Sequence, residues 1–189
     1  MTDRSRLLRV RAGYAQVVSQ PGGEIHGTDP FATPHELRSP IRQLRGRFAS
    51  GVALWTAPGP AGFTVSSTVV VDGDPGRLLG IVDDESELWD AIESAGVFAV
   101  TPLGPGDRQL ADRFAGLMPA PGGLFRDPIW TPTEFGPVPT AASTWAGCRL
   151  DEARPFGWGL LIEATIMATT IGSGDEPLVH YRGRYRELG

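Results

Sequence analysis

The sequence predicts a mainly β protein, a small antiparallel barrel that is closed or partly open, with a few short helices. Short runs rich in Val, Thr and aromatic residues recur along the chain, as is typical of strands. The 189 residues include 25 glycines and 17 prolines, which separate these runs and mark frequent turns. About six main strands with short helices between them fit a barrel better than a helical bundle.

Residues 1–30 are mixed in character and end in a turn-rich stretch. We interpret them as an N-terminal arm, either loosely ordered or laid on a partner subunit, and expect one domain over residues 31–189. A helix is expected over residues 40–48, because Ser39 can cap it and Pro40 suits its first turn. Strands rich in Val, Thr and Ser are expected at 52–56, 63–71 and 77–82.

The apolar pattern then changes to a helical period. Residues 86–96 predict a short helix, with Ser86 as its cap and Gly96 as its stop. A second capped helix is expected over residues 107–116. The remaining strands are expected at 97–100, 144–150, 159–170 and 178–184, with a long Pro-rich connection over 118–145.

Composition excludes several classes of function. The net charge of −5 argues against a general nucleic-acid binder, which should be basic. No run approaches the roughly 20 apolar residues of a membrane helix, and the first residues lead into no secretory signal. All 17 basic residues are arginine, which excludes Schiff-base chemistry and a Walker-type phosphate loop. The single cysteine, Cys148, excludes an internal disulfide, and we expect a cytoplasmic protein.

Six segments, taken in order and spacing, resemble one known family. They are Arg-Phe-Ala-Ser-Gly-Val at 47–52, Gly-Phe-Thr-Val-Ser-Ser at 62–67, Ile-Val-Asp at 81–83, Val-Phe-Ala-Val at 97–100, Leu-Ala-Asp-Arg-Phe-Ala-Gly at 110–116 and Pro-Leu-Val-His-Tyr-Arg-Gly-Arg-Tyr at 177–185. Together they resemble the flavin reductase-like family with the FMN-binding split barrel, from about residue 45 to residue 188. The resemblance depends on all six segments in register.

The resemblance implies a Greek-key split β-barrel that forms a homodimer, with FMN or FAD bound between the subunits. It also implies NAD(P)H as the co-substrate and a partner monooxygenase that receives the reduced flavin. The resulting expectation is an NAD(P)H-dependent flavin (FMN) oxidoreductase. Two alternatives stay open: a non-enzymatic flavin-binding paralogue, and an interaction barrel without a cofactor.

The second strand of this family pattern holds the residues expected at the flavin ring. A flavin ring needs backbone N–H and small hydroxyl groups at its edge, since its N1–C2=O end gains negative charge on reduction. These groups are expected from one strand end, at Thr64, Val65, Ser66, Ser67 and Thr68. The alternative is that Ser and Thr only alternate along a strand.

The resemblance also implies that the flavin's phosphate lies at the start of the 86–96 helix, where a helix N-terminus favours anions. From the family's pattern the chain keeps Asp83 and Ser86, but Asp84 stands where Arg is common and Leu88 where Thr is common. The acids at 83–85 would repel a phosphate unless they point away or are paired, although acids at a helix N-terminus also stabilise the helix. A metal site at 83–85 is the weaker alternative, because neighbouring side chains point apart.

Further residues are assigned to the cofactor from later segments. Arg113 and Phe114, on the 107–116 helix, are expected to reach the phosphate and the ring. Tyr181 and Arg182, in the final strand, are expected near the ring or at the dimer seam. A solvated arginine and ordinary core aromatics are the alternatives for these positions.

The family's Gly-Asp-His motif, often placed near the nicotinamide, is missing. Residues 153–160 contain no histidine, which leaves Phe156 or Trp158 to cover the ring by stacking, unless both only pack in the core or an interface. Hydride transfer needs no protein acid, because the flavin accepts the hydride. We therefore assign no catalytic residue.

Overall fold

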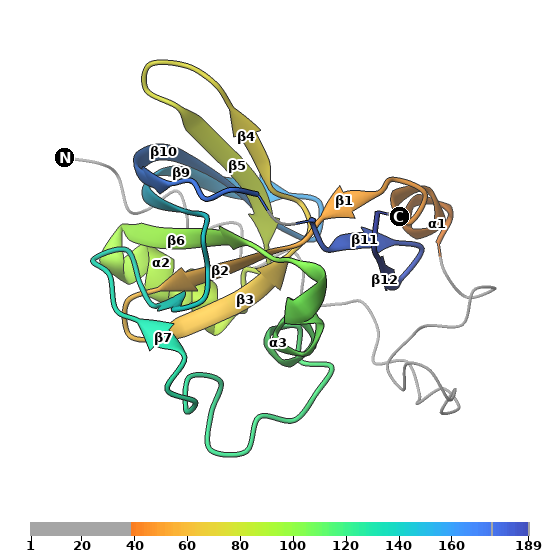
Figure 1. Ribbon diagram of the computed structural model, residues 1–189. Helices are drawn as coiled ribbons and strands as arrows, with labels where there is room; N and C mark the ends of the chain where they lie inside the picture. Colours follow the sequence, from red (N-terminus) through yellow and green to blue (C-terminus); the bar gives the residue numbers. More distant parts are fainter. Residues whose placement is uncertain (1–38, 175, 189) are drawn as a thin grey trace. The chain divides into compact units, whose positions relative to one another are not determined.

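The computed structural model describes residues 39–174 and 176–188, and the arm expected over residues 1–30 lies outside them (Figure 1). The chain divides into two units, 1–38 and 39–189. The helices are α1 (Pro40–Arg45), α2 (Glu87–Ala95), the 3-10 helix η2 (Pro105–Asp107) and α3 (Arg108–Phe114). The strands are β1 (Ser50–Gly51), β2 (Ala53–Ala57), β3 (Ala61–Val65), β4 (Val69–Val71), β5 (Arg77–Val82), β6 (Val97–Pro102), β7 (Trp130–Thr131), β8 (Val138–Pro139), β9 (Trp145–Phe156), β10 (Gly159–Thr170), β11 (Val179–Tyr181) and β12 (Arg184–Arg186).

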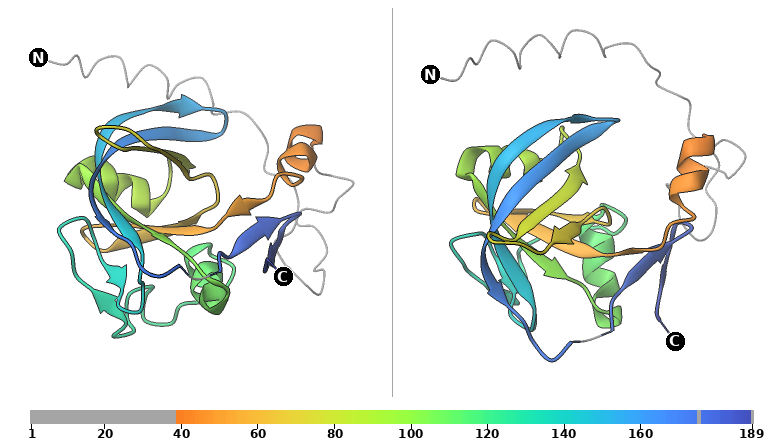
Figure 2. Two further views of the ribbon diagram at one scale, coloured as in Figure 1. Left: turned by 45° about the horizontal axis from the view of Figure 1, so that its top comes forward. Right: turned by 90° about the horizontal axis from the view of Figure 1, so that it is seen from above.

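The main sheet has seven strands in the order β3-β2-β6-β9-β10-β5-β4, and each neighbouring pair is antiparallel. Figure 2 shows this sheet curling around its core, with α2 beside it. A separate three-stranded sheet, β1-β11-β12, lies next to α1, and β7 pairs with β8. The expected mainly β, antiparallel fold with a few short helices is confirmed.

The barrel core is built around two stacked aromatic rings. The rings of Trp55 on β2 and Phe98 on β6 lie 4.8 Å apart, and both side chains are fully buried. Gly80 makes room for them, because a Cβ there would lie 2.7 Å from the Trp55 ring. Helix α2 covers this core with Leu88 and Ile92, which are four residues apart and therefore share one face.

A second core lies between α3 and the strands β2 and β3. Phe114 is 1% exposed, and its ring centroid lies 5.1 Å from Phe125 and 5.5 Å from Trp130. The segment after α3 is thus anchored by aromatic packing over Gly62, where a Cβ would approach Phe114 to 2.7 Å. This packing explains how a long, Pro-rich connection becomes part of the domain, and β7 and β8 are short strands within it.

Two of the expected strands are wrong, because each is divided in the structure. The strand expected over 63–71 becomes β3 and β4, since β3 pairs with β2 while β4 pairs with β5. The strand expected over 178–184 becomes β11, which ends at Tyr181, and β12, joined by a tight turn. The first helix also ends earlier than expected, at Arg45. By contrast, α2 has the expected Ser86 cap and a left-handed Gly96 at its end.

Within the described residues, no helix combines the length and hydropathy needed to span a bilayer.

Candidate functional site

The segment 66–68, between β3 and β4, ties the two sides of the barrel together. The Ile81 backbone N–H donates to Ser67 Oγ at 2.9 Å, and Ser67 Oγ donates to the Ile81 carbonyl at 3.0 Å. Thr68 Oγ1 accepts a hydrogen bond of 3.0 Å from Trp55 Nε1. The hydroxyls of Ser67 and Thr68 therefore already hold the fold, while the backbone N–H groups of 66–68 lie outside both ladders.

The earlier residues of this strand also have structural partners. Thr64 Oγ1 donates to the Ala111 carbonyl of α3 at 2.8 Å. Val65 is 3% exposed and packs in the barrel core. The Thr64 hydroxyl is thus used by a hydrogen bond within the fold, and the Val65 side chain is used by core packing. Ser66, the next residue, is half-buried.

The turn before α2 lies close to the 66–68 segment, because Ile81 stands two residues before Asp83 on the same strand exit. Ser86 Oγ accepts the Trp89 N–H at 3.2 Å and donates to the Asp83 carbonyl at 2.6 Å. Asp83 Oδ1 accepts the Glu85 N–H at 3.0 Å. The structure therefore brings together the ring-edge segment and the expected phosphate turn.

This turn carries a concentrated negative charge. Asp83, Asp84, Glu85 and Glu87 are all exposed, and none of them forms an ion pair with another described residue. Side chains also occupy two of the local N–H donors that a phosphate would use. The exposed acids and the occupied N–H groups both oppose the binding of an anion at this turn. The described residues contain no group of three or more His, Cys, Asp or Glu placed to hold a metal.

Arg113 and Phe114 do not lie at this turn. Arg113 Nη1 forms a 2.9 Å ion pair with Asp127 Oδ2, on the segment that follows α3. Phe114 is buried among Phe125 and Trp130, so its ring is not available to stack on a ligand. The sequence placed both on one helix, but it did not reveal that the following segment covers Phe114.

Tyr181 ends strand β11 of the small sheet, and Arg182 follows it in the turn to β12, apart from the seven-stranded barrel. The Arg182 guanidinium carbon lies 5.3 Å from the centre of the Tyr181 ring. Arg182 has a φ of 52°, and its backbone N–H donates to the Gly46 carbonyl at 2.9 Å. The left-handed conformation belongs to the turn between β11 and β12, and it directs the chain back past α1.

The β9–β10 hairpin ends beside the turn before α2. Leu160 pairs with Val82, and a Cβ at Gly159 would lie 2.5 Å from the Val82 carbonyl oxygen. Trp158 at the hairpin tip is 86% exposed, and Phe156 is 57% exposed. An uncovered indole thus stands at the same end of the sheet as Asp83.

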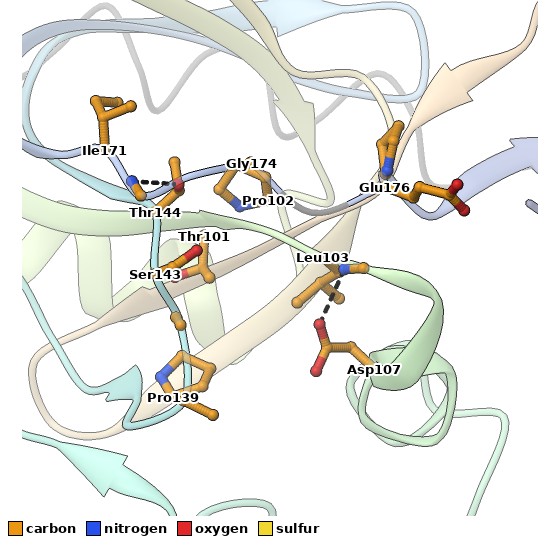
Figure 3. Close-up of a pocket in the computed structure, with 15 residues that line it drawn as sticks. Thr101, Pro102, Leu103, Asp107, Pro139, Ser143, Thr144, Ile171, Gly174 and Glu176 are labelled. Atoms are coloured by element: carbon orange, nitrogen blue, oxygen red, sulfur yellow. Dashed lines mark hydrogen bonds between the residues drawn. The ribbon is translucent and has the colours of Figure 1, made fainter. Parts of the chain in front are cut away.

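A separate cavity of about 350 Å³ lies between the end of β6, the segment before β9 and the segment after β10 (Figure 3). Asp107 borders it and accepts the Gly104 N–H at 2.9 Å, while Thr144 Oγ1 accepts the Gly172 N–H at 3.1 Å. Ser143 and Glu176 also line it, and none of the residues assigned to the cofactor from sequence does. The glycines and prolines around it gave no chemical signal that sequence reasoning could have used.

Burial shifts the pKa of three side chains whose types serve elsewhere as acids, bases or nucleophiles. Burial raises the pKa of the Cys148 thiol to about 12, so this thiol is not a nucleophile near neutral pH. Burial, followed by the charge and hydrogen bond of Asp112, raises the pKa of Tyr185 to about 12. Burial and the nearby Arg45 lower the pKa of His180. Tyr185 packs against the second core.

The comparison with known protein families matches residues 45–189 to the Flavin reductase like domain. The chain belongs to this family. The family expected from the six sequence segments is therefore confirmed, and with it the expectation of a flavin reductase.

Curated relatives and solved structures agree with this assignment. The chain is 27% identical to the FMN reductase (NADH) RutF of Variovorax paradoxus, over 84% of this chain and 91% of that protein. It is 29% identical to the reductase component of a 4-nitrophenol 4-monooxygenase/4-nitrocatechol 2-monooxygenase from Rhodococcus opacus, over 78% of this chain and 80% of that protein. BorF, the flavin reductase component of a bacterial two-component tryptophan halogenase, is similar in structure, with a TM-score of 0.70 and 26% identity, covering 78% of this chain and 98% of BorF.

Proposed function

We propose that this protein is an NADH-dependent FMN reductase. The family match supports the reaction class. The hydrogen bonds between Ser67 and Ile81 support the location of the site, because they join the ring-edge segment to the turn before α2. Relatives named FMN reductase (NADH) and NADH:FMN oxidoreductase favour FMN and NADH over FAD and NADPH.

The chain's own residues would hold the ring and position the nicotinamide. Backbone N–H groups of residues 66–68 are the donors proposed for the ring edge, since they are free of both ladders and lie beside β5. FMN, when bound, supplies the hydride-accepting chemistry. The exposed indole of Trp158 is proposed to pack on the nicotinamide, because a flat, uncovered aromatic side chain stacks on a flat ring. No protein acid or base is assigned to the hydride transfer.

In the proposed site, the phosphate of FMN meets an acidic turn. The turn of Asp83 and Ser86 is proposed to face the phosphate. Arg113 is proposed as the cation that binds the phosphate, and it would have to leave Asp127 to do so. The same acidic turn favours a second candidate function, a flavin-binding protein without reductase activity, if the phosphate group is not held firmly. FAD would meet the same turn with its diphosphate.

We also propose that the protein acts as a homodimer and passes reduced flavin to a partner monooxygenase. Strand β4 supports the dimer, because its residues Val69, Val70 and Val71 are 49%, 64% and 48% exposed at the edge of the main sheet. An uncharged apolar edge strand is normally covered. The relative from Rhodococcus opacus, which is a monooxygenase reductase component, supports the partner.

The test is direct. Purified protein is titrated with FMN, FAD and riboflavin, and binding is followed by quenching of flavin fluorescence. NADH oxidation is then measured with and without FMN. Binding with NADH oxidation supports the reductase, binding without oxidation supports the second candidate, and the absence of binding contradicts both.

A further inference from the structure

The cavity of about 350 Å³ beside β6 takes no part in the proposed flavin site (Figure 3). Its walls come from the end of β6 with the turn into η2, from the segment before β9 and from the segment after β10. None of the residues proposed to hold the flavin or the nicotinamide lines it. Ligand pockets occupy about 300–1,000 Å³, so a cavity near the lower limit suits a small molecule better than a dinucleotide.

Hydrogen bonds between these segments fix the walls of the cavity. The Leu178 N–H donates to the Leu103 carbonyl at 2.7 Å, and the Gly172 N–H donates to Thr144 Oγ1 at 3.1 Å. Gly172 also lets two walls approach closely, because a Cβ there would lie 2.4 Å from the Cβ of Ser143. The cavity is therefore preformed, and a ligand would lose little free energy in ordering the chain around it.

The inner wall of the cavity is mainly apolar. Leu103 is 2% exposed, and Pro139 is buried as well. Ala141 and Ala142 line the cavity with small side chains that leave its space unfilled. A molecule that fills this cavity therefore needs an apolar part, because apolar surface is better buried against apolar surface than left in water.

The charge at the cavity is negative. Among the described residues that line it, Asp107 and Glu176 are ionisable, and neither forms an ion pair within 39–174 or 176–188. Asp107 is half-buried beside Leu103, and one of its carboxylate oxygens accepts the Gly104 N–H at 2.9 Å. By contrast, the half-buried side chain of Asp151 pairs with two arginines. A half-buried carboxylate without a cation favours a ligand that brings one.

We propose that this cavity binds a small organic amine, with its apolar body against Leu103 and Pro139 and its ammonium group at Asp107. An ammonium group donates three hydrogen bonds, and the Asp107 carboxylate and the Ser143 hydroxyl, which both line the cavity, can accept them. Glu176, exposed at the rim, adds negative potential that attracts a cation. A bare metal ion fits less well, because no group of three or more His, Cys, Asp or Glu in the described chain is placed to hold one.

Three probes with the same ring test the proposal without reference to activity: benzylamine, the neutral benzyl alcohol and the anionic benzoate. In an amide NMR titration of the full chain, benzylamine should bind most tightly and shift the signals of Gly104 and Gly172. Asp107→Asn keeps an oxygen that accepts the Gly104 N–H, so the turn should stay folded. It should weaken benzylamine roughly three- to tenfold and leave benzyl alcohol unchanged. Glu176→Gln should have a smaller effect, because its side chain is exposed.

Glu134→Gln is the matched control, since Glu134 is an exposed acid between β7 and β8 that does not line the cavity. Ala142→Phe should fill the cavity and abolish the binding of benzylamine and benzyl alcohol, with the fold checked by circular dichroism. The amine site is overturned if the wild type binds benzylamine no better than the other two probes or not at all at millimolar concentration. An affinity that Asp107→Asn leaves unchanged, or that Glu134→Gln lowers equally, overturns it as well. FMN titration of the same proteins tests the proposed function separately, because the flavin site and the cavity share no residue.

Discussion

The side chain of Ser67 and the backbone of Ile81 exchange hydrogen bonds in both directions, with distances of 2.9 Å and 3.0 Å. Ser67 thereby acts as one more rung of pairing along β5, at the point where the chain changes from β3 to β4. This rung holds the proposed ring-edge segment beside the turn that starts α2. The Ser67 hydroxyl therefore stabilises the fold, and the groups proposed to bind the flavin are the backbone N–H groups around it.

Ser67→Ala should destabilise the protein, because the Ile81 N–H and carbonyl both lose their partner. An unsatisfied buried group costs about 1–3 kcal/mol, and we expect a loss of unfolding free energy in that range. Urea denaturation followed by circular dichroism measures it. Ser66→Ala is the control, since no side-chain bond of Ser66 stabilises the barrel among the contacts described, and equal losses in the two variants would contradict the assignment.

If Arg113 binds the flavin phosphate, Asp127 should compete with that phosphate for the Arg113 guanidinium. Asp127→Asn removes the acid, so it should free the guanidinium and increase the affinity for FMN. Arg113→Ala should reduce the affinity for FMN by up to roughly tenfold. Riboflavin lacks the phosphate and should change little in either variant. The measurement is the dissociation constant of FMN and of riboflavin for each variant and the wild type. If all three proteins bind FMN with the same affinity, Arg113 does not bind the phosphate and serves only to hold the segment after α3 through Asp127.

The pH dependence of stability should carry a contribution from His180. Its folded pKa lies below the ordinary 6.5, because burial and Arg45 disfavour the charged ring. The unfolded chain therefore binds the proton first, so stability is full above about pH 6.5 and falls as the pH drops toward the folded pKa. NMR titration of the His180 ring signal, and unfolding free energies at neutral and mildly acidic pH, measure this.

Arg45→Ala supplies the control for His180. Removing the positive charge should raise the His180 pKa toward 6.5 and reduce the loss of stability on acidification. A folded-state pKa above 6.5 in the wild type would show that the ring is better paired than the structure indicates.

Helix α2 shows what the sequence predicts well. Its Ser86 cap and Gly96 stop are local signals, and they mark the helix ends that the structure has. The strand expected over 63–71 shows the opposite case. Its Val and Thr content is continuous, but the change of partner from β2 to β5 depends on residues far away in sequence, and only the folded chain reveals it.

The candidate site divides in the same way. The proximity of the 66–68 segment to the turn at Asp83 follows from the family pattern, and the structure shows the bond that produces it. The burial of Phe114 could not be predicted, because a helix pattern gives an apolar face without naming what covers it. Here Phe125 and Trp130 cover it, from a connection whose sequence reads as a loop.

Trp158 is the residue through which the proposed nicotinamide contact can be tested. Its indole is 86% exposed at the tip of the β9–β10 hairpin, so truncating it should leave the fold stable. Aromatic pairs contribute about 0.5–1.5 kcal/mol beyond area burial, which corresponds to an increase of roughly 2- to 12-fold in KM for NADH in Trp158→Ala. Because hydride transfer requires no group on this side chain, kcat should change much less. Trp158→Phe should recover most of the KM, and Phe156→Ala, which removes a neighbouring exposed ring, is the control. Steady-state kinetics with FMN in excess gives both constants. If KM for NADH stays at the wild-type value in Trp158→Ala, the nicotinamide does not stack on the indole of Trp158, and the proposed contact is wrong.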